Sequence, residues 1–299
     1  MLGCLLGLAV GDAIGTTVEF RPRGSFAPLT DMVGGGPFDL PAGAWTDDTS
    51  MALCLADSLL SCSGFDPADQ MRRYLEWYRN GLWSSTGRCF DIGNTVRAAL
   101  HRFEQSGEPF AGSTDPHSAG NGSIMRLAPV PMFFYPDISA AIRQAAESSR
   151  TTHGAAECVD ACRLLAAMLC HAFDGRSKSH VLHPDGLNPA ELSPRIAAIA
   201  RGSYRAKSAD EIRGSGYVVD ALEAACWCFW RTDNFRDAVL LAANLGDDAD
   251  TTAAIVGQIA GAWYGVEAIP APWLDRLVMA EDIRELALQL CHHKPTHRS

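Results

Sequence analysis

Residues 250–265 read DTTAAIVGQIAGAWYG, and this stretch indicates the fold class. Its apolar side chains recur at helical spacing, and its small residues favour close packing against neighbouring helices. Comparable patterns recur along the chain, whereas alternating strand-like runs are scarce. They predict helices in TDDTSMALCLADSLLSC (46–62), DPADQMRRYLEWYRNGL (66–82), DIGNTVRAALHRFEQSG (91–107), THGAAECVDACRLLAAMLCHAF (152–173) and GYVVDALEAACWCFW (216–230). We therefore predict a mainly α-helical, compact bundle.

The composition is that of an ordinary globular protein, with 299 residues of which 47% are apolar and 20% are charged. The most polar stretch, DGRSKSHVLHPDGLNPAELS at 174–193, reads as a surface loop. Chemically notable clusters lie on both sides of this loop. We therefore expect one domain over residues 1–299.

The net charge limits the kinds of binding partner that we expect, and the cysteines indicate the cellular compartment. The formal charge is −10, which disfavours nucleic-acid binding. The start, MLGCLLGLAVGDAIG, has no basic residue ahead of its apolar run, which Gly and Asp12 interrupt, so neither a signal peptide nor a membrane span is expected. Ten scattered cysteines without a CxxC pair are typical of reduced core thiols in a cytoplasmic protein.

Two clusters of Asp and Thr lie almost two hundred positions apart, in WTDDTSM (45–51) and NLGDDADTTA (244–253). Each stands where a loop gives way to a helical pattern. Helix capping explains either cluster alone, because Asp and Thr accept hydrogen bonds from the free N–H groups of a first turn. One carboxylate per helix would be enough for capping, however, and each cluster holds more.

The second interpretation is a shared cation site. Asp47, Asp48, Asp248 and Asp250 would repel one another in a common pocket unless a cation lay between them. Oxygen ligands without His or Cys point to Mg²⁺, Mn²⁺ or Ca²⁺ and away from zinc. Glu19, in a loop flanked by glycines, could reach over such a pocket from outside. Sequence spacing alone leaves capping and metal binding about equally supported.

Three further stretches could touch a ligand. AGNGSIMRLAPV (119–130) offers a turn whose N–H groups could cradle a diphosphate at a helix start, although an ordinary Asn-Gly turn is the simpler reading. Arg126 in this stretch is assigned a structural role. Thr152 and His153 stand at one expected helix start and Asp91 at another, where capping is the default role and acid or base chemistry the alternative.

Taken together, these stretches resemble the ADP-ribosylglycohydrolase family. The motifs are GCLLGLAVGDAIGTTVEF (3–20), GAWTDDTSMAL (43–53), DIGNT (91–95), GNGSIMR (120–126), TTH (151–153) and NLGDDADTTAAIVGQIAGAWYG (244–265). Each motif is weak by itself, but their order and spacing along the whole chain make the resemblance specific.

The resemblance implies an all-α, compact, orthogonally packed multi-helix bundle with a centre of two divalent cations, Mg²⁺ or Mn²⁺. Such a centre would cleave the N- or O-glycosidic bond at C1″ of ADP-ribose. The implied metal ligands are Thr46, Asp47, Asp48, Asp248, Asp250 and Thr251. The implied catalytic residues are Glu19, Asp48 and Asp91, and the implied substrate contacts are Gly120, Asn121, Gly122, Ser123 and His153.

The resemblance also implies the partners. The expected substrate is an ADP-ribosylated protein, with arginine-linked ADP-ribose favoured through the similarity to the dinitrogenase reductase-activating glycohydrolase. Two alternatives stay open: hydrolysis of a free ADP-ribose conjugate, such as a 1″-phosphate or an acetyl ester, and a non-catalytic ADP-ribose reader. A monomer is the expected state.

Overall fold

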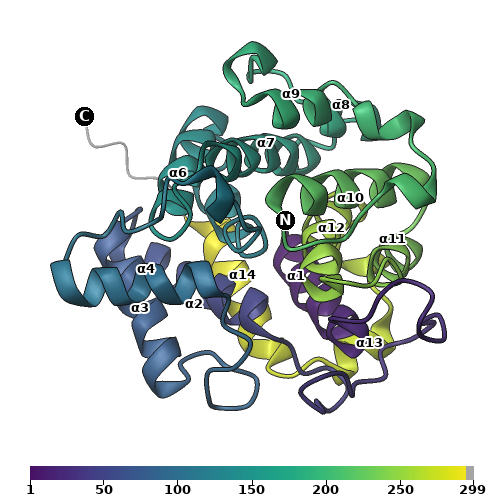
Figure 1. The fold of residues 1–299 in the computed structure, drawn as a ribbon, viewed down its shortest axis with the longest axis horizontal. Helices are drawn as coiled ribbons and strands as arrows, with labels where there is room; N and C mark the ends of the chain where they lie inside the picture. Colours follow the sequence, from purple (N-terminus) through teal and green to yellow (C-terminus); the bar gives the residue numbers. More distant parts are fainter. Residues whose placement is uncertain (294–299) are drawn as a thin grey trace.

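The structure, a computed structural model, describes residues 1–293, which contain no β-strand and fold into fourteen α-helices (Figure 1). The expected all-α class is confirmed. The helices are α1 (Leu2–Gly15), α2 (Asp47–Cys62), α3 (Pro67–Asn80), α4 (Asn94–Ser106), α5 (Pro129–Phe134), α6 (Ile138–Arg150), α7 (Ala156–Phe173), α8 (Lys178–Leu182), α9 (Pro194–Ala200), α10 (Val218–Arg231), α11 (Phe235–Ala243), α12 (Ala249–Tyr264), α13 (Ala271–Arg276) and α14 (Ala280–His292).

Helices α1 and α12 form the most extensive helix–helix contact, and they lie side by side near the middle of Figure 1. A Cβ atom added to Gly11 of α1 would lie 2.1 Å from the Ala253 carbonyl oxygen of α12, so only glycine permits this approach. The four residues Gly3, Gly7, Gly11 and Gly15 meet, in the same order, Gly261, Gly257, Ala253 and Ala249. The two helices are therefore antiparallel and touch backbone to backbone.

This antiparallel pairing positions the chemically notable residues. It places the end of α1, and Glu19 shortly after it, beside the start of α12 at Asp248 and Asp250. Asp12 of α1 also accepts hydrogen bonds from the first turn of α2. Three helix ends that are distant in sequence therefore meet at one point.

Most buried apolar side chains form one core around α1, α12, α7 and α10. A smaller cluster, which includes Met51, Tyr74, Trp77 and Leu100, lies between α2, α3 and α4. Helix α2 contributes residues to both clusters. The ten cysteines are unpaired and seven of them are buried, as expected for core thiols.

The first helix, whose apolar sequence raised the question of a membrane span, is buried over almost its whole length. Within residues 1–293, none of the helices combines the length and the apolar character that crossing a bilayer needs.

Candidate metal centre and ligand cavity

The two Asp/Thr clusters meet in the folded chain. The Thr46 hydroxyl lies 3.2 Å from Oδ2 of Asp250 and 3.4 Å from Oδ2 of Asp48. The Thr251 hydroxyl lies 3.3 Å from the same Asp48 oxygen. Segments separated by about two hundred positions thus contribute oxygens to a single buried group.

Capping does not explain this arrangement. Thr46 and Asp248 occupy the N-cap positions of α2 and α12, but neither side chain makes a capping hydrogen bond to its own helix. The free backbone N–H groups at the start of α2 are instead bound by a residue of another helix. Asp12 of α1 accepts hydrogen bonds from the Thr49 amide at 3.0 Å and the Thr46 amide at 2.9 Å. The oxygens of the two clusters are therefore free to face one another.

Two oxygens in this group lack any partner. Oδ1 of Asp48 and Oδ1 of Asp250 are buried and accept no hydrogen bond from residues 1–293. A buried carboxylate oxygen without a partner is costly and calls for a bound group. The carboxylate and hydroxyl atoms of this group that could coordinate a metal ion are all oxygens. Hard divalent cations such as Mg²⁺ and Mn²⁺ prefer oxygen ligands. The residues present therefore fit a divalent cation.

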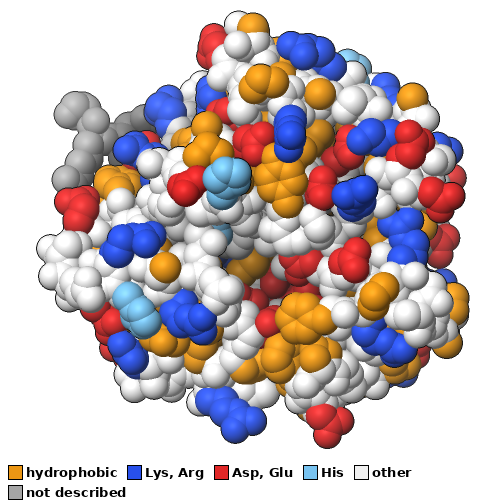
Figure 2. Space-filling model, viewed as in Figure 1, with side chains coloured by type: hydrophobic (Ala, Val, Ile, Leu, Met, Phe, Trp, Pro, Cys, Tyr) orange, Lys and Arg blue, Asp and Glu red, His pale blue; other side chains and the backbone are white. Residues whose placement is uncertain are grey.

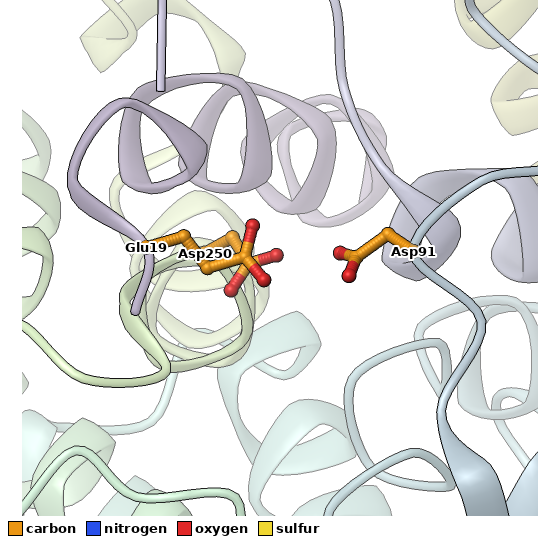
Figure 3. A group of neighbouring side chains, drawn as sticks. All are labelled: Glu19, Asp91 and Asp250. Atoms are coloured by element: carbon orange, nitrogen blue, oxygen red, sulfur yellow. The ribbon is translucent and has the colours of Figure 1, made fainter. Parts of the chain in front are cut away.

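Three acidic side chains from separate segments, one of them Asp250, meet at the same centre. Glu19 follows α1, Asp91 precedes α4 and Asp250 lies in the first turn of α12, and one carboxylate oxygen of each lies within 4.8 Å of the other two. Figure 3 shows the Glu19 and Asp250 carboxylates next to each other, with that of Asp91 pointing toward them from the opposite side.

Burial and mutual repulsion perturb the acidity of these groups. Desolvation, followed by the charges of Asp91 and Asp248, raises the pKa of Glu19 to about 9. Desolvation likewise raises the pKa of Asp91 to about 7 and moves the pKa of Asp250 well above its ordinary value. A bound cation would favour the charged forms, because it compensates both causes.

Asp12 is a member of this group that the sequence reasoning missed. It is fully buried and accepts four hydrogen bonds, from the amides and from the hydroxyls of Thr46 and Thr49. The Thr46 hydroxyl donates its hydrogen to Asp12 at 2.9 Å, so its remaining lone pairs can face Asp48 and Asp250. The only signal in the sequence was one carboxylate inside an otherwise apolar helix.

A cavity of about 690 Å³ opens above the acidic group. Figure 2 shows red acidic side chains in the depth of a hollow near the middle of this face, with orange apolar side chains along its edge. Its lining includes Glu19, Asp47, Asp91, Gly120, Asn121, Gly122, His153, Asp248, Asp250 and Thr251. Thr46 and Asp48 lie beneath this lining, fully buried.

The 120–123 stretch forms part of the cavity wall, but as a turn and not at a helix start, since α5 begins only at Pro129. The side-chain amide of Asn121 donates a hydrogen bond of 2.6 Å to Oδ2 of Asp248, which ties this turn to the acidic group. Gly122 has no room for a side chain, because a Cβ atom would lie 2.8 Å from Cε1 of His153. Ser123 faces the interior and contacts Ser149.

The tautomer of His153 follows from a chain of hydrogen bonds behind it. Arg126 is fully buried and donates to the Thr152 hydroxyl at 2.7 Å, and that hydroxyl lies 2.9 Å from Nδ1 of His153. Arginine only donates, so the hydroxyl accepts from Arg126, and Nδ1 of His153 is the one acceptor that residues 1–293 offer to the hydrogen of the hydroxyl. Burial, then the charge of Arg126, lowers the pKa of His153 to about 3. The neutral ring therefore carries its proton on Nε2, near Gly120 and Gly122.

Two local predictions were wrong. Asp91 does not head its helix: α4 begins at Asn94 after Gly93, and Asp91 has a left-handed backbone with φ of 57°. That conformation turns its carboxylate toward the cavity and away from the helix amides. Thr152 and His153 do not start α7 either, because they lie in the turn between Arg150, where α6 ends, and Ala156.

Comparison with known proteins agrees with the geometry. The family model described as ADP-ribosylglycohydrolase matches residues 1–299. The chain is 50% identical over 293 residues to ADP-ribosylarginine hydrolase Tri1 of Pseudomonas putida (strain GB-1), covering 98% of this chain and 78% of the relative. It is 33% identical to the ADP-ribosyl-(dinitrogen reductase) glycohydrolase of Rhodospirillum rubrum, covering 97% of this chain and 93% of the relative.

Comparison with solved structures leads to the same family. A solved structure described as an ADP-ribosylglycohydrolase-related protein complex matches with a TM-score of 0.85 at 45% identity, covering 98% of this chain and 96% of the other. The full-length match to the family model and the identity to these relatives lead to one conclusion: this chain is a member of the ADP-ribosylglycohydrolase family.

Proposed function

We propose that this protein hydrolyses the bond between C1″ of ADP-ribose and an arginine side chain of a modified protein, with the help of divalent cations. The observation that carries the proposal is the pair of unpartnered oxygens of Asp48 and Asp250 at the base of a large cavity. The arginine linkage is supported by the relatives at 50% identity, which are named ADP-ribosylarginine hydrolases.

Six side chains would hold two cations, Mg²⁺ or Mn²⁺: Thr46, Asp47, Asp48, Asp248, Asp250 and Thr251. When bound, the cations supply Lewis acidity to ribose and water oxygens and neutralise the carboxylates. Asp12 holds the Thr46 hydroxyl in the orientation that leaves its lone pairs toward the centre.

Glu19 and Asp91 are the groups placed to move protons. Hydrolysis breaks the C1″–N bond and forms a C1″–O bond from water, while the guanidine leaves with a proton. Both carboxyl groups line the cavity and have oxygens within 4.8 Å of each other, so one would give a proton to the departing guanidine while the other takes a proton from the attacking water. Asp48, beneath the cavity floor, acts by holding the cations.

The rest of the cavity wall fits the nucleotide. In the Gly120–Gly122 turn, the N–H groups of Gly120 and Asn121 donate to the carbonyls of Ser118 and Gly216, so the Gly122 N–H and the Nε2–H of His153 would be the donors for the diphosphate. A second cavity of about 930 Å³ adjoins the first and shares Thr95, Gly120 and Gly216 with it. The two together give room for the distal ribose, the diphosphate and the adenosine in one extended ligand.

The test is a panel of arginine-linked, serine-linked and polymeric ADP-ribose and ADP-ribose 1″-phosphate, each assayed with Mg²⁺, with Mn²⁺ and with a chelator. We expect release of ADP-ribose from the arginine-linked substrate, loss of turnover in chelator and recovery when either cation is restored. Turnover of the 1″-phosphate alone would establish the free-conjugate activity instead. ADP-ribose binding without turnover of any substrate would establish a reader.

A further inference from the structure

Two exposed residues at the cavity rim have no role in the centre described above. Phe20 is 64% exposed and follows Glu19, and Asp247 is exposed and precedes Asp248. Both line the cavity. The aromatic face of Phe20 and the carboxylate of Asp247 are therefore both available to a group bound in this cavity.

The backbone holds these two residues together. The Phe20 amide donates to the Asp247 carbonyl at 2.7 Å, and the Asp247 amide donates to the Arg21 carbonyl at 2.8 Å. Both residues adopt left-handed conformations, with φ of 60° for Phe20 and 55° for Asp247. This conformation is uncommon for a bulky aromatic residue, and it persists here because paired hydrogen bonds enforce it.

Contacts with other residues leave part of the Phe20 ring and the carboxylate of Asp247 available to a ligand. Within residues 1–293 the Phe20 ring has one aromatic neighbour, Phe38, in a T-shaped arrangement with a centroid distance of 6.4 Å. Asp247 belongs to none of the ion pairs formed by residues 1–293. Arg23, in a recess next to Asp247, instead donates to the carbonyls of Ala209 and Ile212.

We infer that Phe20 and Asp247 form the acceptor subsite, which binds the guanidinium group of the ADP-ribosylated arginine. This inference rests on the proposed function and names the residues that would select its acceptor. A guanidinium is planar and cationic, so it stacks on an aromatic face and pairs with a carboxylate. Phe20 supplies the face and Asp247 the carboxylate.

The position of the pair fits the direction of the substrate. The second cavity meets the first at Gly120 and Gly216, and neither Phe20 nor Asp247 lines it. If the adenosine end of ADP-ribose lies in the second cavity, the part of the first cavity that Phe20 and Asp247 line is not occupied by the nucleotide. The group attached to C1″ lies at the other end of the ribose from the diphosphate, so it would point toward this side.

The experiment compares Phe20→Leu and Asp247→Asn with the wild type on an arginine-ADP-ribosylated peptide, together with calorimetric binding of ADP-ribose alone. Leucine keeps the bulk but removes the aromatic face. Asparagine tolerates a left-handed backbone and removes only the charge. Phe20→Tyr keeps the ring and serves as the conservative variant.

Two matched variants control for surface changes. Val33→Ala alters a side chain that is 59% exposed in the same loop, and Asp39→Asn alters an exposed Asp with φ of 51°. Neither residue lines the cavity. Both variants should retain wild-type kcat/KM.

We expect Phe20→Leu and Asp247→Asn each to raise KM for the peptide by about three- to tenfold, the range for a partly exposed cation–π contact or ion pair, with kcat nearly unchanged. Phe20→Tyr should retain wild-type KM, and the Kd of ADP-ribose should stay within about twofold in all variants, since it lacks the acceptor. An unchanged KM, or an equal rise in the Kd of ADP-ribose, would overturn the acceptor subsite while the proposed function stands. A wild type that does not cleave the peptide would overturn both.

Discussion

The hydroxyl of Thr46 lies 3.2 Å from a carboxylate oxygen of Asp250, although 204 positions separate these residues in the chain. The contact exists because α1 and α12 pack antiparallel with glycine between them, while Asp12 of α1 holds the start of α2. Local helix formation and close packing therefore create the acidic centre.

Removing a proposed cation ligand should abolish activity without unfolding the protein. We expect Asp250→Asn to lower kcat/KM by more than about 100-fold, since even outer-sphere partners of a metal ligand account for 10- to 100-fold. Its helix content, measured by circular dichroism, should match the wild type because the substitution nearly preserves shape. Full activity of this variant in chelator would contradict a metal mechanism.

The stability of the protein should respond to cations in a pH-dependent way. The pKa of Glu19 is raised from 4.5 to about 9 and that of Asp91 from 3.8 to about 7, so protonation favours the folded state. In chelator, this stabilisation is complete below about pH 4 and is lost as the pH rises through 7 and 9. The Tm gained on adding Mg²⁺ should therefore increase with pH in thermal melts. A gain that is constant from pH 5 to 9 would be inconsistent with these shifts.

Asp12 should matter for both stability and cation binding. Asp12→Ala leaves the amides of Thr46 and Thr49 and the Thr49 hydroxyl without their acceptor, and we expect it to lower the free energy of unfolding by about 2–4 kcal/mol in urea titrations. Calorimetry should also show weaker Mg²⁺ binding. Asp12→Asn keeps one carbonyl acceptor and should lose less stability. Equal stability of the alanine variant and the wild type would argue against this role.

The proton position on His153 can be observed directly. Nitrogen-15 NMR should show the Nε2–H tautomer from pH 5 to 8, because the pKa of His153 is lowered to about 3 and the Thr152 hydroxyl donates to Nδ1. Thr152→Ser retains this donor and should retain the tautomer. Thr152→Val removes the donor, and its spectrum should show Nδ1–H character. Identical spectra for all three proteins would rule out control by this hydrogen bond.

Close packing of α1 against α12 should make Gly257 irreplaceable. A Cβ atom there would lie 2.1 Å from the Gly7 carbonyl oxygen, so Gly257→Ala should cost about 2–4 kcal/mol of folding free energy despite the higher helix propensity of alanine. Gly64→Ala is the control, because the nearest atom to its Cβ would be 4.0 Å away. The measurement is urea unfolding of both variants. Equal midpoints would show that the helices can separate without cost.

The helices themselves were largely predictable. The expected segments 46–62 and 250–265 correspond closely to α2 and α12, because apolar periodicity is a local property that a single segment carries. Short helices such as α5 and α8 were not assigned, since one or two turns are too short to show a period. The family resemblance was also readable, because it depends on the order of motifs along the chain.

Several features of the site could not be read from the sequence. Asp91 looked like a helix cap, but its left-handed backbone turns it into the cavity. Ser123 belonged to a turn expected to hold phosphate, yet its side chain faces Ser149 in the interior. The direction of a side chain in a turn depends on one or two backbone angles, and these are set by neighbours from other segments.

The sequence by itself determined where helices form, that two of them begin with clustered carboxylates, and which family the chain resembles, because each of these depends on the nearby order of residues. Only the tertiary structure decided that the clusters meet, that Asp12 orients Thr46, and that Phe20 stands beside Asp247. These relationships depend on how α1 packs against both α12 and the start of α2, because the pattern within one segment does not encode which other segments approach it.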